Sequence, residues 1–160
     1  MIERKDIADE LLDLIRQAGM LYYRLVLILG PVGSGKTTLL RYAEDKLSSP
    51  IINVGLELSR RLISLTAEQR KLEIGTILEE VVGSTRTDIV LMDNLEVLFD
   101  PGLEQDPLRL LQGLSRNRTI VATWNGSITD GQLIYAEPQH FEYRKYKTQD
   151  FLFLNVDGIE

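Results

Sequence analysis

Apolar residues in this chain form two kinds of pattern. Continuous apolar runs, bounded by glycine, proline or polar residues, predict strands that are buried on both faces. They cover residues 25–29, 51–54, 88–94 and 119–124, and two weaker ones cover 133–136 and 151–156. Apolar positions at helical spacing predict helices over residues 3–18, 36–47, 57–82 and from 106 onward. Strands that alternate with helices predict an α/β fold of three layers, a mostly parallel five-stranded sheet with helices on both faces.

Short polar motifs mark where these helices begin. Thr66 and Gln69 have the spacing of a capping box, which divides the segment 57–82 into two helices. Asp106 followed by Pro107 is typical of a helix start, because the proline nitrogen needs no partner at the first helical position.

The helix predicted over residues 3–18 is amphipathic. Its apolar face is formed by Ile7, Leu11, Leu14, Ile15 and Ala18, and Gly19 follows as a C-terminal stop. We expect this face to pack against the edge of the sheet, and the alternative is that it binds a partner protein.

A glycine-rich segment joins the first strand to the next helix. Residues 30–37 read GPVGSGKT, which matches the phosphate-binding P-loop (Walker A) pattern G-x-x-x-x-G-K-S/T. The backbone N–H groups of such a loop turn toward a phosphate at the positive end of the helix. Lys36 would reach the β- and γ-phosphates, and the Thr37 hydroxyl would ligate Mg²⁺. The predicted nucleotide-binding residues are Gly30, Pro31, Val32, Gly33, Ser34, Gly35, Lys36, Thr37 and Thr38.

An acidic residue ends the third predicted strand. Four apolar residues precede Asp93, which is the Walker B pattern. A carboxylate at the end of a buried strand beside the P-loop strand can bind Mg²⁺ through its water shell. Thr37 and Asp93 are therefore the predicted metal ligands.

The residue after Asp93 departs from a familiar pattern. The order of motifs resembles P-loop ATPases of the AAA+ and related type, which usually carry a catalytic Glu at this position. Here the residue is Asn94, which cannot accept a proton from water. Glu96 can substitute as the general base, and the alternative is an exposed acid at a helix start. The sequence therefore predicts slow intrinsic hydrolysis.

The fourth predicted strand ends at Asn125 and Gly126. In AAA+-like ATPases a polar sensor residue at this place orients the attacking water or contacts the γ-phosphate, and Asn125 is the candidate for it. The alternative is that Asn125 and Gly126 form only a turn.

Basic residues are further candidates for a function in catalysis or in nucleic-acid binding. Arginine fingers that act in trans stabilise transition-state charge in many such enzymes, and the candidates are Arg116, Arg118, Arg60 and Arg61. For each one, a solvated surface arginine is the alternative. Basic and aromatic residues also interleave at Phe141, Tyr143, Arg144, Lys145, Tyr146 and Lys147. These could contact single-stranded nucleic acid or a base, and a strand with one packed side is the alternative.

Composition narrows the classes of function. A chain of 160 residues is the size of one domain, which we expect to span residues 1–160 with the core from residue 20. No cysteine and one histidine exclude disulfides and thiolate or histidine-rich metal sites. A net charge of −6 argues against a general nucleic-acid coat. No apolar run approaches a membrane span and no signal-peptide core is present, so we expect a cytoplasmic protein.

Four segments together resemble the BrxF family, the small P-loop proteins of type 3 BREX bacteriophage-defence systems. They read GPVGSGKTTLL, DIVLMDNLEVLFD, TIVATWNG and LIYAEPQHFEYRKY. The resemblance implies a stand-alone ATPase in antiviral defence. Its partners would be the other defence components, including a DNA methyltransferase, a phosphatase-like protein and a larger ATPase, and any contact with DNA would be indirect.

The leading interpretation is an AAA+-like ATP-binding protein that acts with partners. The chain has no room for the helical lid that AAA+ proteins usually carry, so partners or a homo-oligomer would complete the site. The lack of an N-K-x-D motif favours ATP over GTP. Two alternatives stay open. One is a small-molecule kinase, for which residues 138–147 offer a sparse lid, and the other is a non-hydrolysing nucleotide-dependent adaptor, consistent with Asn94.

Overall fold

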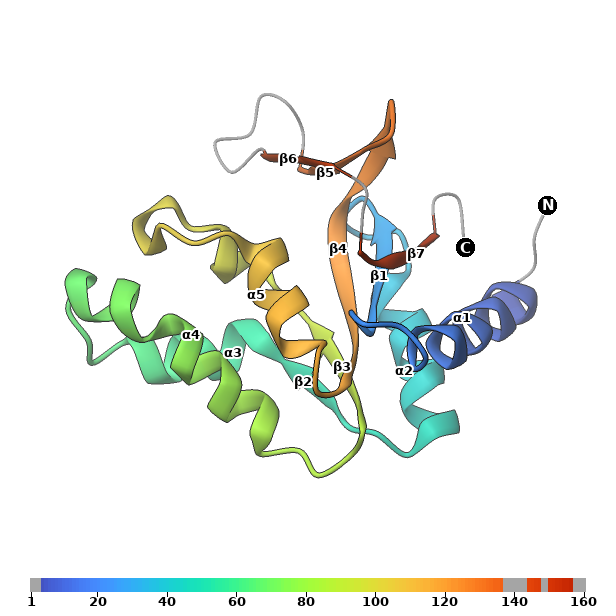
Figure 1. Ribbon diagram of the computed structural model, residues 1–160, viewed down its shortest axis with the longest axis horizontal. Coiled ribbons are helices and arrows are strands. Elements are labelled where there is room, and N and C mark those ends of the chain that lie inside the picture. Colours follow the sequence, from blue (N-terminus) through green and yellow to red (C-terminus); the bar gives the residue numbers. More distant parts are fainter. Residues whose placement is uncertain (1–3, 137–143, 148–149, 157–160) are drawn as a thin grey trace.

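Five parallel strands form the sheet of the computed structural model, which describes residues 4–136, 144–147 and 150–156. They lie in the order β2-β3-β4-β1-β7 (Figure 1). Their bounds are β1 Leu25–Gly30, β2 Ile51–Asn53, β3 Ile89–Asp93, β4 Thr119–Thr129 and β7 Leu152–Asn155. In this order β4 lies between β1 and β3, with Leu29 beside Trp124 and Met92 beside Ala122. The prediction of a mostly parallel sheet is confirmed, and the described residues add two antiparallel strands to these five.

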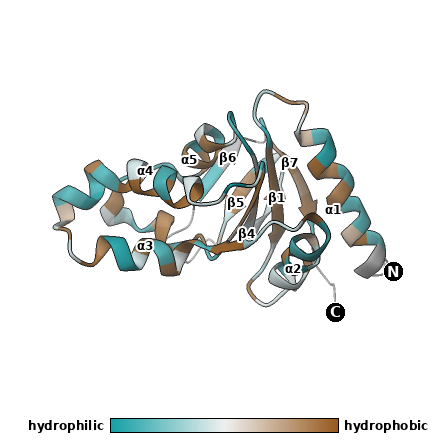
Figure 2. Ribbon diagram, turned by 90° about the horizontal axis from the view of Figure 1, so that it is seen from below, coloured by the Kyte–Doolittle hydropathy of each residue, from teal (hydrophilic) through white to brown (hydrophobic). Residues whose placement is uncertain are grey.

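Helices cover both faces of this sheet (Figures 1 and 2). One face carries α1 (Arg4–Ala18) and α2 (Lys36–Leu47). The other carries α3 (Val54–Leu62), α4 (Ala67–Gly83) and α5 (Pro107–Leu114), with the 3-10 helices η1 (Glu96–Phe99) and η2 (Pro101–Leu103). Because side chains alternate along a strand, Val26 and Ile28 enter one core while Leu25, Leu27 and Leu29 enter the other. The three-layer α/β fold is therefore as predicted.

The predicted helix starts are present. Thr66 and Gln69 form both hydrogen bonds of the capping box, and the Asp106 carboxylate accepts the N–H of Arg109 at the start of α5. Helix α3 begins at Val54 rather than Glu57, because the Asn53 side chain caps it by accepting the N–H of Leu56. Its first residue therefore follows β2 without a loop.

The apolar face of α1 packs on the sheet as expected. Ile7, Leu11, Ile15 and Ala18 are buried in the same core as Val26 and Ile28, and Leu14 is partly buried against it. Among the described helices, none is long and apolar enough to cross a membrane. Within the described residues no helix follows α5.

The end of β4 differs from the prediction. The strand does not stop at Trp124 but continues through Asn125 and Gly126 to Thr129, where it pairs antiparallel with β5 (Gln132–Tyr135). The turn lies instead at Asp130 and Gly131, both with positive φ, as a two-residue hairpin requires. The prediction of a turn at Asn125 and Gly126 is wrong, because the hydrogen bonds to β5 keep both residues extended.

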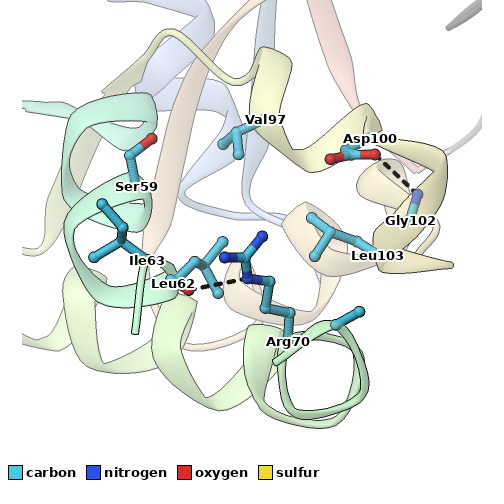
Figure 3. Close-up of a pocket in the computed structure, with 9 residues that line it drawn as sticks. Ser59, Leu62, Ile63, Arg70, Val97, Asp100, Gly102 and Leu103 are labelled. Carbon is cyan, nitrogen blue, oxygen red and sulfur yellow. Dashed lines mark hydrogen bonds between the residues drawn. The ribbon is translucent and has the colours of Figure 1, made fainter. Parts of the chain in front are cut away.

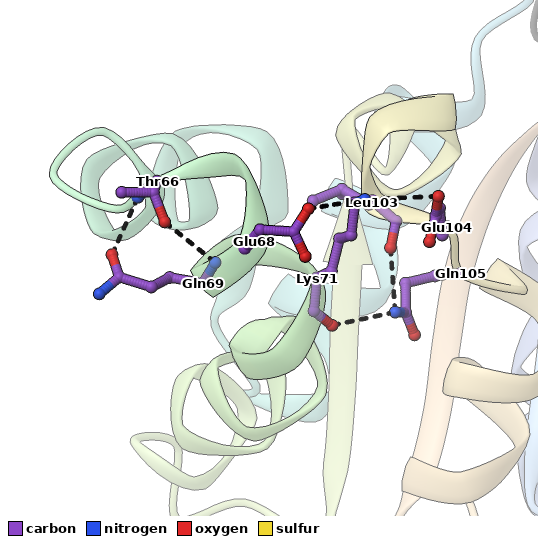
Figure 4. Close-up of polar contacts among 7 residues, drawn as sticks. All are labelled: Thr66, Glu68, Gln69, Lys71, Leu103, Glu104 and Gln105. Carbon is purple, nitrogen blue, oxygen red and sulfur yellow. Dashed lines mark hydrogen bonds and ion pairs between the residues drawn. The ribbon is translucent and has the colours of Figure 1, made fainter.

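The hairpin is extended by β6 (Arg144–Lys147), which pairs with β5 and projects beyond the parallel sheet in Figure 1. The Arg144 guanidinium donates a hydrogen bond of 2.9 Å to the Gln105 carbonyl. The Gln105 amide in turn donates to the carbonyls of Lys71 and Leu103 (Figure 4). This chain of contacts ties the hairpin to η2 and to α4.

We predict that Gly126→Ala destabilises the protein by about 3 kcal/mol, because a Cβ at this position collides with the backbone carbonyl of Ile134. Gly113→Ala in α5 is the matched control, since nothing lies within 4 Å of its added Cβ. That change should stabilise the helix by roughly 0.5–1 kcal/mol. Urea unfolding of both variants measures the effect. Equal midpoints for Gly126→Ala and the parent would contradict the close approach of β4 and β5.

Candidate nucleotide-binding site

The P-loop connects β1, which lies between β4 and β7, to the start of α2. Gly33 and Gly35 take left-handed φ values of 79° and 100°, which only glycine adopts without strain. These angles turn the loop back across the end of β1 and place it at the N-terminus of a 12-residue helix. Backbone N–H groups and the helix dipole there both favour an anion.

The Lys36 side chain folds back into the loop that precedes it, and the residue is only 6% exposed. Its ammonium donates to the carbonyls of Gly30 (2.8 Å) and Pro31 (2.6 Å) and, at 3.4 Å, to the Ser34 hydroxyl. Burial lowers the pKa of Lys36, while the carboxylates of Asp93 and Glu96 act in the opposite direction. A phosphate bound in the loop would supply the negative charge that favours the protonated amine.

The Asp93 carboxylate ends β3 and is 7% exposed. Its Oδ2 accepts a hydrogen bond of 2.9 Å from the Thr37 hydroxyl, so the two predicted metal ligands are neighbours. Its Oδ1 accepts from the Thr123 hydroxyl at 2.7 Å and from the Asn94 N–H at 3.0 Å. A hydroxyl and a carboxylate oxygen are ligands that suit Mg²⁺, which usually completes its shell with water and phosphate oxygens.

Asn125 and Glu96 close the other side of the site. The Asn125 amide donates to Glu96 Oε1 at 2.7 Å. Asn94 is exposed and takes φ 59°, which turns the chain between Asp93 and η1. A cavity of about 320 Å³ lies among these residues, lined by Val32, Gly33, Gly35, Lys36, Thr37, Thr38, Asp93, Asn94, Glu96 and Asn125. The structure thus brings the predicted metal ligands and every predicted catalytic residue except the arginines into one cavity, although their functions stay predictions.

Thr123 is the residue that the sequence analysis missed. It is 4% exposed and gives Asp93 the shortest of its hydrogen bonds. The available signal was a polar side chain inside the otherwise apolar segment of β4. Thr123 fixes the carboxylate so that Oδ2 faces Thr37, and it is a positioning residue.

The arginine candidates lie away from this cavity. Arg116 and Arg118 precede β4, at the end of the strands opposite the P-loop (Figure 1). Arg118 donates to the carbonyls of Val82 and Thr85, and Arg116 stacks on Tyr22. Neither serves the cavity of its own chain, so a function in trans stays a prediction.

The other basic candidates also have structural contacts. Arg60 pairs with Glu57 and Arg61 with Glu80, all on exposed surface. Arg144 lies over the Phe99 ring, 6.0 Å from its centroid, in addition to its bond to Gln105. Lys145 is exposed on β6. Phe141 and Tyr143 lie outside the described residues, as do the side chains of Tyr146 and Lys147, so the predicted basic and aromatic cluster stays a prediction.

Strand order and site together define the class of fold. The P-loop follows β1, the acid ends β3, and the strand that carries the sensor candidate lies between them. This is a P-loop NTPase fold with an AAA+-like strand order.

Comparisons with known proteins give distant likenesses only. No family model matches the chain, and no curated protein matches it. Among solved structures it is similar to C. elegans PCH-2, with 18% identity and a TM-score of 0.48 over 98% of this chain and 43% of that one. AMPPCP-bound DnaA from Aquifex aeolicus is similar with 21% identity and a TM-score of 0.42, over 77% of this chain and 39% of that one. The chain spans less than half of either protein. At these TM-scores the likenesses carry no argument, and the fold class rests on the strand order.

We predict that Thr123→Val weakens the Mg²⁺ site while Thr123→Ser preserves it. Valine keeps the shape of the buried side chain but removes the donor to Asp93 Oδ1, which costs roughly 1–2 kcal/mol in stability. The freed carboxylate should raise the Mg²⁺ concentration needed for half-maximal nucleotide binding by about tenfold. Titration of Mg²⁺ against a fluorescent ATP analogue measures this. An equal Mg²⁺ requirement in all three proteins would show that Thr123 is only a packing residue.

Proposed function

We propose that the chain is an ATP-binding protein and a slow, Mg²⁺-dependent ATPase. The hydrogen bond between Thr37 and Asp93 is the observation that supports this most directly. It joins two motifs 56 residues apart in sequence, beside a loop whose backbone and lysine suit a triphosphate. No guanine-reading motif is present, which favours ATP.

Different residues of the cavity bind the phosphates and the metal ion. The N–H groups of the loop and the Lys36 ammonium bind the β- and γ-phosphates. Thr37 and Asp93 hold Mg²⁺, which when bound neutralises charge on the phosphates. Because burial lowers the pKa of Lys36 in the free protein, phosphate binding takes up a proton at alkaline pH. Affinity for ATP should therefore fall as the pH rises through that lowered pKa.

Glu96 is the general base in this proposal. Asn94 follows Asp93 but has no proton-accepting group, whereas Glu96 lines the same cavity. The Asn125 amide binds one oxygen of Glu96 and leaves the other to accept a proton from water. Asn125 then positions the base rather than only marking a turn.

We expect hydrolysis to be slow because of where the arginine candidates lie. Arg116 and Arg118 precede β4, Arg60 and Arg61 pair with Glu57 and Glu80, and none of the four lines the cavity. We infer that none of them neutralises transition-state charge in the site of its own chain. A cation from a second copy or from a partner would raise the rate. The protein would then act as a homo-oligomer or as one part of a larger assembly.

We extend the proposal to the biological setting on the resemblance to BrxF. The chain would act in the cytoplasm in a type 3 BREX antiviral defence complex, where its nucleotide state controls assembly with the other components. The support for this step is the set of four similar segments. Contact with DNA would run through those partners, consistent with the net charge of −6.

Lys36→Ala should weaken ATP binding by about 100-fold, because two charge-assisted hydrogen bonds to the phosphates are lost. Equilibrium binding of a fluorescent ATP analogue measures this, and phosphate release by Lys36→Ala gives the blank for hydrolysis. Lys46→Ala, at the far end of α2, is the matched control and should bind as the parent does. ATP affinity that is the same in both variants would rule out the P-loop as the binding site.

Glu96→Gln should lower the rate of ATP hydrolysis by about 10²-fold at unchanged ATP affinity, since the amide cannot accept a proton. Glu73→Gln on the exposed side of α4 is the matched control and should leave the rate unchanged. Phosphate release is measured over a range of protein concentrations. A rate of hydrolysis in Glu96→Gln equal to that of the parent would show that another residue is the general base. If the parent binds ATP but never exceeds the Lys36→Ala blank, the adaptor interpretation replaces the ATPase.

Asn94→Glu should speed hydrolysis by at least about tenfold, because it adds a second proton acceptor next to Asp93. The left-handed φ of 59° at this position suits Asn better than Glu, so the variant should lose about 1 kcal/mol of stability. Single-turnover phosphate release and thermal unfolding measure the two effects. An unchanged or lower rate in a folded variant would count against the idea that Asn94 limits hydrolysis.

A further inference from the structure

A second cavity adjoins the candidate nucleotide site. It also measures about 320 Å³ and lies between the end of α3, the start of α4 and the segment that contains η1 and η2 (Figure 3). The two cavities share η1, since Glu96 lines the first and the next residue, Val97, lines the second. A volume of this size is that of an ordinary ligand-binding pocket.

The lining of this cavity combines aliphatic side chains with the polar side chains of Ser59, Arg70 and Asp100. Leu62 and Leu103 are buried, and Ile63 at the rim is 80% exposed. Arg70 Nε donates to the Leu62 carbonyl at 2.9 Å, which anchors the guanidinium. Figure 3 shows its terminal nitrogens directed into the hollow between Leu62, Val97 and Leu103. Within the described part of the chain no hydrogen-bond acceptor pairs with these nitrogens. The two terminal nitrogens of the guanidinium, here called the Arg70 fork, are therefore available to bind a planar anion.

Asp100 supplies an acceptor to the same cavity. Its Oδ1 accepts the N–H of Gly102 at 2.9 Å, and among the described residues it forms no ion pair with Arg70. The second oxygen is therefore free to accept an N–H from a bound molecule. A cation, an acceptor and aliphatic side chains in one lining match a group that carries a carboxylate, an N–H and an aliphatic side chain.

The geometry points to a docking site for a segment of a partner polypeptide in which an aliphatic side chain lies next to a carboxylate. The aliphatic group packs on Leu62, Val97 and Leu103, the carboxylate binds the Arg70 fork, and a backbone N–H binds Asp100. A polypeptide fits better than a small metabolite because it also covers the exposed Ile63 at the rim. Charge complementarity to Arg70 selects a segment that places a carboxylate at this point, while its N–H faces the Asp100 carboxylate in the same lining.

N-acetyl-L-leucine carries all three groups and is the probe. Titrated into the nucleotide-free protein and followed by two-dimensional NMR, it should give saturable shifts at the N–H groups of Arg70, Gly102 and Leu103. A Kd on the order of a few mM is expected for a ligand of this size. N-acetyl-L-leucinamide, which lacks the carboxylate, should bind at least about tenfold more weakly. Because no nucleotide is present, this result is independent of the proposed ATPase.

Three variants test the assignment. Arg70→Gln should abolish the shifts, and Arg61→Gln, an equal change of charge on exposed α3 surface, should not. Ile63→Asp changes an exposed side chain, so the protein should stay folded while the acid at the rim repels the probe. Absence of saturable shifts up to about 30 mM probe, or equal binding of acid and amide, would overturn the proposal. Self-association of the chain that Arg70→Gln abolishes would assign the cavity to a second copy instead.

Discussion

The Asp93 carboxylate accepts hydrogen bonds from three different elements, and the candidate site depends on this arrangement. Thr37 reaches it from the start of α2, Thr123 from β4 and the Asn94 N–H from the chain that leaves β3. A buried carboxylate is stable only when such donors satisfy it. The same donors fix its orientation, so one oxygen faces Thr37 and the P-loop. The strand order β3-β4-β1 makes the arrangement possible, because it puts the Thr123 strand between the two motif strands.

The short segment after Asp93 links this site to the rest of the molecule. It turns at Asn94, enters η1 at Glu96 and continues to η2, so it forms a wall of both cavities. On the other side Asn125 belongs to β4, which continues without a break into the hairpin. The hydrogen bond between Asn125 and Glu96 therefore joins the hairpin strand to the wall of the second cavity.

In this cavity the groups proposed to bind phosphate and metal are held by buried hydrogen bonds, whereas the groups proposed for catalysis are exposed or distant. The loop, Lys36, Thr37 and Asp93 are held by buried hydrogen bonds, which favours tight binding of phosphate and metal. Glu96 is exposed, and Arg118 is committed to backbone carbonyls far from the loop. Among the described residues that line the cavity there is no arginine to stabilise transition-state charge. Under the proposed function, these features favour a protein that keeps its nucleotide bound for a long time. Its rate of ATP hydrolysis would depend on an added partner.

The sequence by itself determined most of the helices and parallel strands, together with the P-loop and Walker B patterns. The capping box at Thr66, the start at Asp106 and the loop at residues 30–37 depend on neighbours within one turn of chain, so local pattern was enough. Only the tertiary structure decided what Asn125, Glu96 and Thr123 do, because their partners lie about 30 residues away in sequence. Asn125 and Gly126 have the composition of a turn, yet pairing with β5 keeps them in a strand. Pairing with the neighbouring strand of the hairpin outweighed the local turn preference of Asn125 and Gly126, and the turn formed at Asp130 and Gly131 instead.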